Sequence, residues 1–129
     1  MKLDIITPEK IIFSASVSMV GIPGTLGDFG VLEGHAPFIS TIRPGVITID
    51  TDSGQRKLAV MSGIAEVVPE RCIILAENVV DCAGLTSQYV EEKAEAAADE
   101  TAAADTESAK KLAETKRQFV EVLRQNIAA

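Results

Sequence analysis

The sequence has no tryptophan, one histidine and two cysteines, and each scarcity excludes a class of protein. Aromatic residues make up only 4% of the chain, so its core must be built mainly from Val, Ile, Leu and Ala, and little remains for stacking on a ligand. The two cysteines, Cys72 and Cys82, are too few for a disulfide framework, and their spacing is not that of a metal site. We expect two buried or half-buried thiols.

Long hydrophobic runs and excess positive charge are also missing. No run of apolar residues is long enough to span a bilayer. The formal net charge of -7 opposes binding to nucleic acid or to an anionic membrane surface. The first residues, Met1-Lys2-Leu3-Asp4, pass at once into a strand-like pattern, which we interpret as the absence of a signal or transit peptide. These features favour a bacterial cytoplasmic protein without direct membrane insertion.

What the sequence does contain, from residue 2 to about residue 84, is a series of short runs rich in Val, Ile and Thr. Many short strands separated by turns predict a β-sandwich or a flattened barrel. Gly63 interrupts the run at 57–68 and predicts a bulge or the close approach of another backbone. We expect residues 72–76 to return along residues 64–68. The turns are expected at Pro8-Glu9, Pro23-Gly24, Asp52-Ser53-Gly54 and Pro69-Glu70-Arg71.

The composition changes near residue 85, because the rest of the chain has no glycine or proline and is rich in alanine. Thr86 or Ser87 can cap a helix that runs to about Ala104. Asp105-Thr106 then makes a turn and a second cap, before a helix to about Asn126. Two helices joined by a short turn form an antiparallel hairpin. The sequence thus predicts an α+β protein, with a β-sandwich at residues 1–85 and a helical hairpin at residues 86–129.

The two expected helices carry opposite charges. Residues 91–105 hold six acids and one lysine and carry -5, whereas residues 106–129 hold five basic residues and three acids and carry +2. Antiparallel packing would place opposite charges side by side, although two solvated helix faces would explain the same pattern. The hairpin can bury only a small apolar surface, so we predict that it is loosely held and can leave its sheet. Its core-like positions are Tyr89, Val90, Leu112, Phe119, Val120, Leu123 and Ile127.

The stretch at residues 24–37 holds four of the nine glycines and the only histidine, His35. This glycine content predicts a folded loop rather than a helix or a long strand. A phosphate cradle is one interpretation, but the P-loop lysine is missing and Asp28 would repel an anion. Catalysis by His35, with Asp28 or Glu33, is a second interpretation, but no nucleophile or second histidine lies nearby. A non-catalytic contact loop is the third, and the residues favour it.

A family resemblance rests on this stretch. Residues 27–37, Gly-Asp-Phe-Gly-Val-Leu-Glu-Gly-His-Ala-Pro, resemble the signature of the ATP synthase epsilon subunit family, which includes the mitochondrial delta subunit. The resemblance continues at Leu3–Glu9, Ile42–Val46 and Ser62–Val67. It covers about the first 85 residues well, whereas the last 45 match only in their charged, alanine-rich, helical character.

The resemblance implies a flattened β-sandwich of about ten strands followed by a helical hairpin. It also implies a non-catalytic subunit in the central stalk of a proton-translocating ATP synthase. Such a subunit couples the ring of c subunits to the gamma subunit, and its hairpin can regulate ATP hydrolysis through the alpha and beta subunits. The expected location is the cytoplasmic face of the bacterial inner membrane, as a peripheral component. No catalytic or metal-binding residue is expected.

Site residues follow from the same resemblance. The expected contact loop for the c-ring and the gamma subunit contains Asp28, Phe29, Glu33 and His35, although Asp28 could instead be a turn-forming residue. The basic residues expected to act in regulation are Lys110, Lys111, Lys116, Arg117 and Arg124.

ATP binding by this chain is not expected. Some members of the family bind ATP through an acid and an arginine at the start of the first helix. Thr86 and Tyr89 stand at those positions here, within the aligned set that also includes Leu85 and Val90. Without the arginine, a phosphate loses its bidentate partner.

Overall fold

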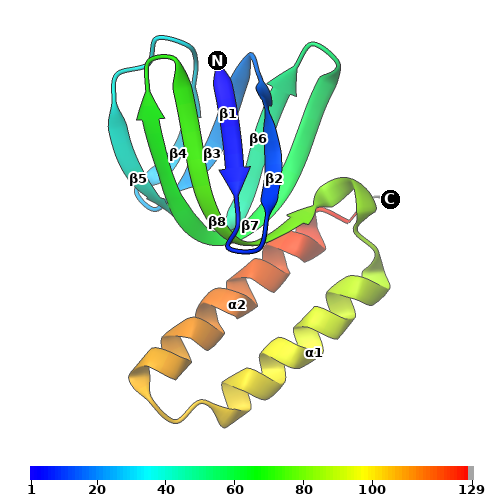
Figure 1. Ribbon diagram of the computed structural model, residues 1–129. Helices are drawn as coiled ribbons and strands as arrows, with labels where there is room; N and C mark the ends of the chain where they lie inside the picture. Colours follow the sequence, from blue (N-terminus) through cyan, green and yellow to red (C-terminus); the bar gives the residue numbers. More distant parts are fainter. Residues whose placement is uncertain (128–129) are drawn as a thin grey trace.

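The computed structural model describes residues 1–127 and consists of a β-body above a pair of helices (Figure 1). This arrangement confirms the predicted α+β class, with a sandwich followed by a helical hairpin. A single 3-10 turn, Cys82–Gly84, connects the two parts. The strands are β1 Lys2–Ile6, β2 Ile11–Ser16, β3 Met19–Gly24, β4 Gly27–Val31, β5 Phe38–Ile42, β6 Gly45–Thr51, β7 Gly54–Val68 and β8 Arg71–Asp81, and the helices are α1 Ser87–Ala103 and α2 Glu107–Gln125.

The β-body contains eight strands instead of about ten, because two of them are long and serve both layers. Strand β7 pairs with β6 through its first half, up to Val60, and with β5 through its second half, from Gly63. Strand β8 accompanies β7 along nearly its whole length and pairs with β1 through its own first half. Counting the halves of β7 and β8 separately restores the expected number. The hydrogen-bonded order is β2-β1-β8-β7-β5-β3-β4, and β6 pairs with β3 and β7.

The core of the β-body lies between these layers and is almost entirely aliphatic. Alternate residues of β6 face inward, as the fully buried Ile47 and Ile49 show, because successive side chains of a strand point to opposite faces. Burial of such side chains stabilises the fold by roughly 25 cal/mol per Å² of apolar surface. The largest fully buried side chains of the β-body are Leu3, Ile5, Val20, Ile22, Val31, Ile47, Ile49, Leu58, Val60, Val67 and Ile74.

Gly63 allows β7 and β8 to approach closely, as predicted. A Cβ atom at this position would lie 2.3 Å from the carbonyl oxygen of Leu75. The expected return of residues 72–76 along residues 64–68 is confirmed by the pairing of Ile64 with Leu75 and of Val67 with Cys72.

The prediction of a folded loop at residues 24–37 is wrong for its first half. Residues 27–31 form strand β4, which pairs with β3 in a register that places Val31 opposite Val20. Local glycine content misled the prediction, because the pairing and the inward-facing Val31 outweigh the weak strand preference of glycine. Gly27, with φ of 137°, closes the tight turn between the two strands. Only residues 32–37 form a loop.

The helical hairpin begins and folds back where its caps predict. The Thr86 hydroxyl accepts a hydrogen bond from the Tyr89 amide at 3.2 Å, and the Thr106 hydroxyl accepts one from the Ala109 amide at 3.1 Å. The hairpin packs on a second apolar cluster, formed with the outer face of the β-body and with η1 (Cys82–Gly84). The buried members of this cluster are Ala59, Met61, Cys82, Leu85, Val90, Ala97, Phe119, Val120 and Leu123.

One expected core residue of the hairpin is exposed. The Leu112 side chain remains 48% exposed, whereas Phe119 is 8% exposed. Leu112 lies in the half of α2 that extends away from the β-body (Figure 1), so no sheet covers it. Helical spacing alone could not distinguish the two halves of α2.

Candidate functional site

Two turns of the β-body are braced together at one end of β3 and β5. We call this feature the double turn; it comprises the two turns together with the strand ends that flank them, residues 23–28 and 41–44. The Thr25 amide donates a hydrogen bond to the Thr41 carbonyl at 3.0 Å, and the two threonine hydroxyls lie 2.6 Å apart. The Arg43 amide donates to the Pro23 carbonyl at 3.0 Å. Backbone and side-chain bonds thus fix the two turns relative to each other.

An ion pair completes this brace. Asp28 lies within β4 rather than at a turn, and its carboxylate accepts a hydrogen bond from the Arg43 guanidinium. The side chains remain 75% and 42% exposed, respectively, so the pair lies at the surface. The sequence analysis identified Asp28 but missed Arg43. The only signal for Arg43 was its place in the Ile42–Val46 segment, and the register that brings it to Asp28 depends on long-range pairing.

Two other residues of the expected contact loop, Phe29 and His35, lie against Phe38. The rings of Phe29 and Phe38 meet edge to face, with centroids 5.0 Å apart, and the His35 ring lies 5.1 Å from Phe38. The His35 Nδ1 atom lies 2.8 Å from the Ala36 carbonyl oxygen. Glu33 is exposed in the loop between β4 and β5. The structure therefore joins Phe29 to His35 through Phe38, whereas Asp28 points to Arg43.

A hydrophobic surface was not foreseen from the sequence. The outer face of β5, β7 and β8 carries Ile39, Ile64 and Leu75, which are 70%, 46% and 52% exposed. Ile64 pairs with Leu75, and Ile39 lies one diagonal step from Ile64 across β5 and β7. We call these three residues the apolar face. A contiguous exposed patch of this kind marks an interaction surface more often than isolated leucines do.

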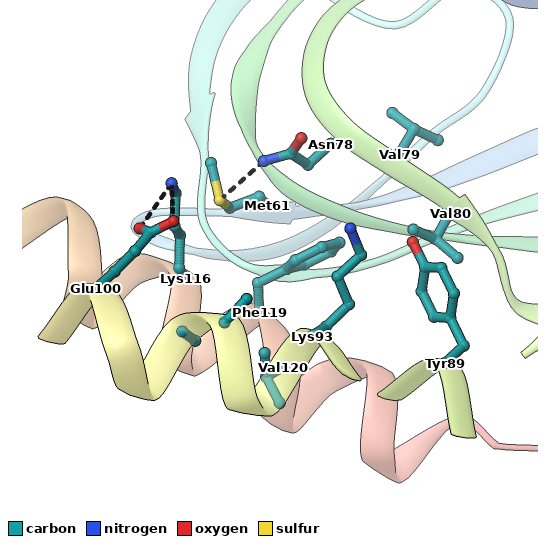
Figure 2. Close-up of a pocket in the computed structure, with 12 residues that line it drawn as sticks. Met61, Asn78, Val79, Val80, Tyr89, Lys93, Glu100, Lys116, Phe119 and Val120 are labelled. Atoms are coloured by element: carbon teal, nitrogen blue, oxygen red, sulfur yellow. Dashed lines mark hydrogen bonds and ion pairs between the residues drawn. The ribbon is translucent and has the colours of Figure 1, made fainter. Parts of the chain in front are cut away.

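A pocket lies between the β-body and the hairpin (Figure 2). Its apolar wall includes Met61, Val80 and Phe119, and the Lys93 ammonium lies 5.4 Å from the centroid of the Tyr89 ring. At its border, the Lys116 ammonium lies 2.8 Å from the Glu100 carboxylate. The lining residues are Met61, Asn78, Val79, Val80, Tyr89, Lys93, Ala96, Ala97, Glu100, Lys116, Phe119 and Val120, and this set contains no arginine.

Three of the five basic hairpin residues form ion pairs within the hairpin. Lys116 pairs with Glu100 across the two helices, and Arg124 lies 3.7 Å from Glu91. Arg117 donates two hydrogen bonds to Glu114 and thereby lowers the pKa of that carboxyl. The two pairs that join the helices, Lys116–Glu100 and Arg124–Glu91, place the opposite charges of the helices side by side, as the sequence indicated.

The other two, Lys110 and Lys111, are exposed near the start of α2 and form no ion pair with any residue from 1 to 127.

The two thiols are buried, as predicted. Burial raises the pKa of Cys72 to about 11 and also raises the pKa of Cys82. Both groups are therefore neutral thiols near pH 7 and poor nucleophiles. Within the described part of the chain, no group of side chains is arranged to hold a metal ion. None of the described helices is long and apolar enough to cross a membrane.

Comparison with solved structures supports the fold. A chain of the Euglena gracilis mitochondrial ATP synthase, in a structure described as OSCP/F1/c-ring, has a TM-score of 0.76 and 20% identity, covering 95% of this chain and 78% of that chain. A chain of the Tetrahymena thermophila mitochondrial ATP synthase central stalk and c-ring has a TM-score of 0.71 and 14% identity, covering 98% of this chain and 96% of that chain.

Sequence comparison extends along the whole chain. The ATP synthase epsilon chain of Rhodospirillum rubrum is 40% identical over 123 residues, which are 95% of this chain and 92% of that protein. The epsilon chain of Parvibaculum lavamentivorans is 34% identical over 128 residues, which are 98% of this chain and 97% of that protein. Residues 1–81 match the family described as ATP synthase, Delta/Epsilon chain, beta-sandwich domain. The chain therefore belongs to the ATP synthase delta/epsilon family and is an accessory subunit rather than an enzyme in its own right.

Proposed function

We propose that this chain is a rotor subunit of the central stalk, which couples the ring of c subunits to the gamma subunit in a proton-translocating ATP synthase. The observation that carries the proposal is the presence of two separate exposed surfaces on one β-body, the apolar face and the double turn. A coupling subunit needs two such contacts, because torque must enter through one partner and leave through another. The chain would act as a peripheral component at the cytoplasmic face of a bacterial inner membrane.

The apolar face is the surface we assign to the gamma subunit. Its exposed side chains contribute a hydrophobic contact, and Glu66, exposed beside Ile39 on the neighbouring strand, supplies a polar rim. We expect Ile64→Glu to abolish co-purification with the gamma subunit, because it would bury a charge in an apolar contact. Leu112→Glu is the matched control, since Leu112 is equally exposed but lies on the hairpin. Retained binding by the Ile64 variant would contradict the assignment.

The double turn is the surface we assign to the c-ring. Asp28 and Arg43 present one carboxylate and one guanidinium there, both accessible. Reversal of the charge in Asp28→Lys would place two cations together and weaken coupling in the assembled enzyme. ATP-driven proton pumping relative to ATP hydrolysis measures that coupling, and an unchanged ratio would refute the assignment.

We also propose that the hairpin regulates ATP hydrolysis. Lys110 and Lys111 are accessible for acidic segments of the alpha and beta subunits, whereas the other three basic residues would first have to leave their intramolecular pairs. Comparing ATP hydrolysis by the complete complex with that of a complex lacking residues 86–129 tests the proposal. Faster hydrolysis after truncation is expected, and an equal rate would contradict it.

The proposal includes no nucleotide cofactor for this chain. The Thr86 hydroxyl is already occupied as the cap of α1, and the aromatic face of Tyr89 lies near Lys93. Calorimetric titration of the full chain with Mg-ATP should give no saturable heat. Saturable binding would show that other residues replace the missing acid and arginine.

A further inference from the structure

The pocket between the β-body and the hairpin is lined by both parts of the molecule (Figure 2). Its volume of about 290 Å³ is close to the lower limit for sites that hold a small molecule. Strands β7 and β8 contribute one wall, with Met61 and Val80, and α2 contributes another, with Phe119 and Val120. A molecule held there would therefore contact the hairpin and the β-body at once.

Lys93 supplies an ammonium group to this pocket without a carboxylate partner. The ammonium forms no ion pair with any residue from 1 to 127, and Figure 2 shows it directed toward the β-body. A helical partner would stand three or four residues away on α1, where the chain has Tyr89, Val90, Ala96 and Ala97. Although α1 is rich in acids, none stands at these positions. The charge of Lys93 is therefore available to an anion that enters the pocket.

Asn78 adds a polar group on the strand side of the pocket. Its φ of 54° is the only positive value among the non-glycine residues from 1 to 127. Residues in this left-handed region are uncommon and gather at functional sites. The Asn78 side-chain nitrogen donates a hydrogen bond to the Met61 sulfur at 3.3 Å, and its second hydrogen remains for another acceptor. The Tyr89 hydroxyl, which also points toward the β-body in Figure 2, is a further donor at the same pocket.

The charges at the border limit the ligand to a single negative charge. The Glu100 carboxylate lies 2.8 Å from the Lys116 ammonium, so this pair cancels and Lys93 is left as the one unpaired cation of the lining. The remaining acids of α1 would repel an anion that carries several charges. The apolar wall requires that the rest of the ligand be hydrocarbon.

We propose that this pocket binds a medium-chain monocarboxylate, with the carboxylate on Lys93 and the alkyl chain against Met61, Val80 and Phe119. The ligand contacts both walls only while the hairpin lies on the β-body, so its binding stabilises the docked hairpin. The site goes beyond the rotor function and does not depend on it.

The test titrates the full chain with octanoate, followed by calorimetry and by amide chemical shifts. A ligand of this size should bind with a dissociation constant on the order of millimolar or below and shift the amides of Val80 and Phe119. Lys93→Gln should weaken octanoate binding about fivefold, as expected for the loss of one partly solvated ion pair. Binding of 1-octanol, which has the same chain without the charge, should be unchanged. Lys110→Gln is the matched control, because Lys110 is also an exposed, unpaired lysine of the hairpin but does not line the pocket.

Hydrogen exchange measures whether the ligand holds the hairpin. At ten times its dissociation constant, octanoate should slow exchange in α1 and α2 about tenfold, and at the same concentration about threefold in the Lys93→Gln variant. Equal octanoate binding by the wild type and by Lys93→Gln would overturn the site, as would amide shifts confined to the apolar face. Absence of octanoate binding by the wild type would also overturn it. None of these outcomes affects the rotor function, which co-purification and proton pumping test separately.

Discussion

Arg43, at the turn between β5 and β6, reaches across to Asp28 on β4 and donates a hydrogen bond to its carboxylate. Strand β4 and strand β5, which ends just before Arg43, are not hydrogen-bonded neighbours, since β3 lies between them. The pair therefore closes one end of the β-body where the sheet itself makes only a single bridge, between Gly24 and Ile42.

The contribution of this pair to stability should be small but measurable. Asp28→Asn and Arg43→Gln should each lower the free energy of unfolding by about 0.2–1 kcal/mol, because both side chains are largely solvated. The double variant should lose less than the sum of the two single variants, which isolates the interaction. Urea denaturation of the four proteins completes the cycle. Strict additivity would show that the pair contributes nothing.

Substitution of Gly63 should destabilise the β-body strongly. The Cβ atom of Gly63→Ala would collide with the backbone of β8, whose Leu75 carbonyl oxygen lies only 2.3 Å away. We expect a loss of about 1–3 kcal/mol of unfolding free energy, as for other overpacked positions. Gly84→Ala is the control, since nothing lies within 4 Å of its added Cβ atom. Chemical denaturation should leave the control within about 0.5 kcal/mol of the wild type.

The attachment of the hairpin should depend on Phe119 and not on Leu112. Phe119→Ala removes a ring packed against the β-body, at a cost of about 3–5 kcal/mol for a buried aromatic residue. Hydrogen exchange should therefore rise throughout α1 and α2 while the strands stay protected. Leu112→Ala should alter exchange little. In the wild type, we expect the hairpin to exchange faster than the β core; equal protection would contradict the prediction of a loosely held hairpin.

Cys72 should resist alkylation until the fold opens. Because burial raises its pKa to about 11, iodoacetamide at pH 8 should react at the rate of global unfolding rather than at that of an exposed thiol. The raised pKa of Cys72 also makes the stability of the fold depend on pH. Between the ordinary value of 9.0 and about 11, the unfolded thiol ionises while the folded thiol keeps its proton, so stability falls as the pH rises through this range.

Replacing Cys72 tests whether its thiol causes this fall in stability. Cys72→Ala should flatten the decline in stability between pH 9 and 11, although the variant is less stable at every pH because its side chain is smaller. An unchanged slope would assign the decline to other groups.

Features that depend on neighbouring residues were predictable from the sequence. Thr86 and Thr106 cap their helices through their own side chains, so the limits of both helices could be read locally. Gly63 was likewise informative, because a glycine within so long a run predicts a bulge or a close backbone approach, and the structure shows the close approach.

Features that depend on long-range register could not be read from the sequence. Residues 27–31 become a strand only because β3 pairs with them, and Asp28 meets Arg43 only in that register. Leu112 has helical core spacing, yet its side chain stays 48% exposed because its half of α2 extends away from the β-body (Figure 1). The apolar face was missed for the same reason, since which side of a strand is covered is decided by tertiary packing.

The position of β1 has a consequence for synthesis. This first strand lies between β2 and β8 and is parallel to β8, with Lys2 opposite Arg71. During translation, β1 leaves the ribosome long before β8, so it can at first close only its hairpin with β2, and its other edge stays open until nearly the whole β-body has emerged. Nascent chains released before β8 would therefore display an unpaired strand edge, which makes prematurely terminated products of this gene candidates for aggregation or rapid proteolysis.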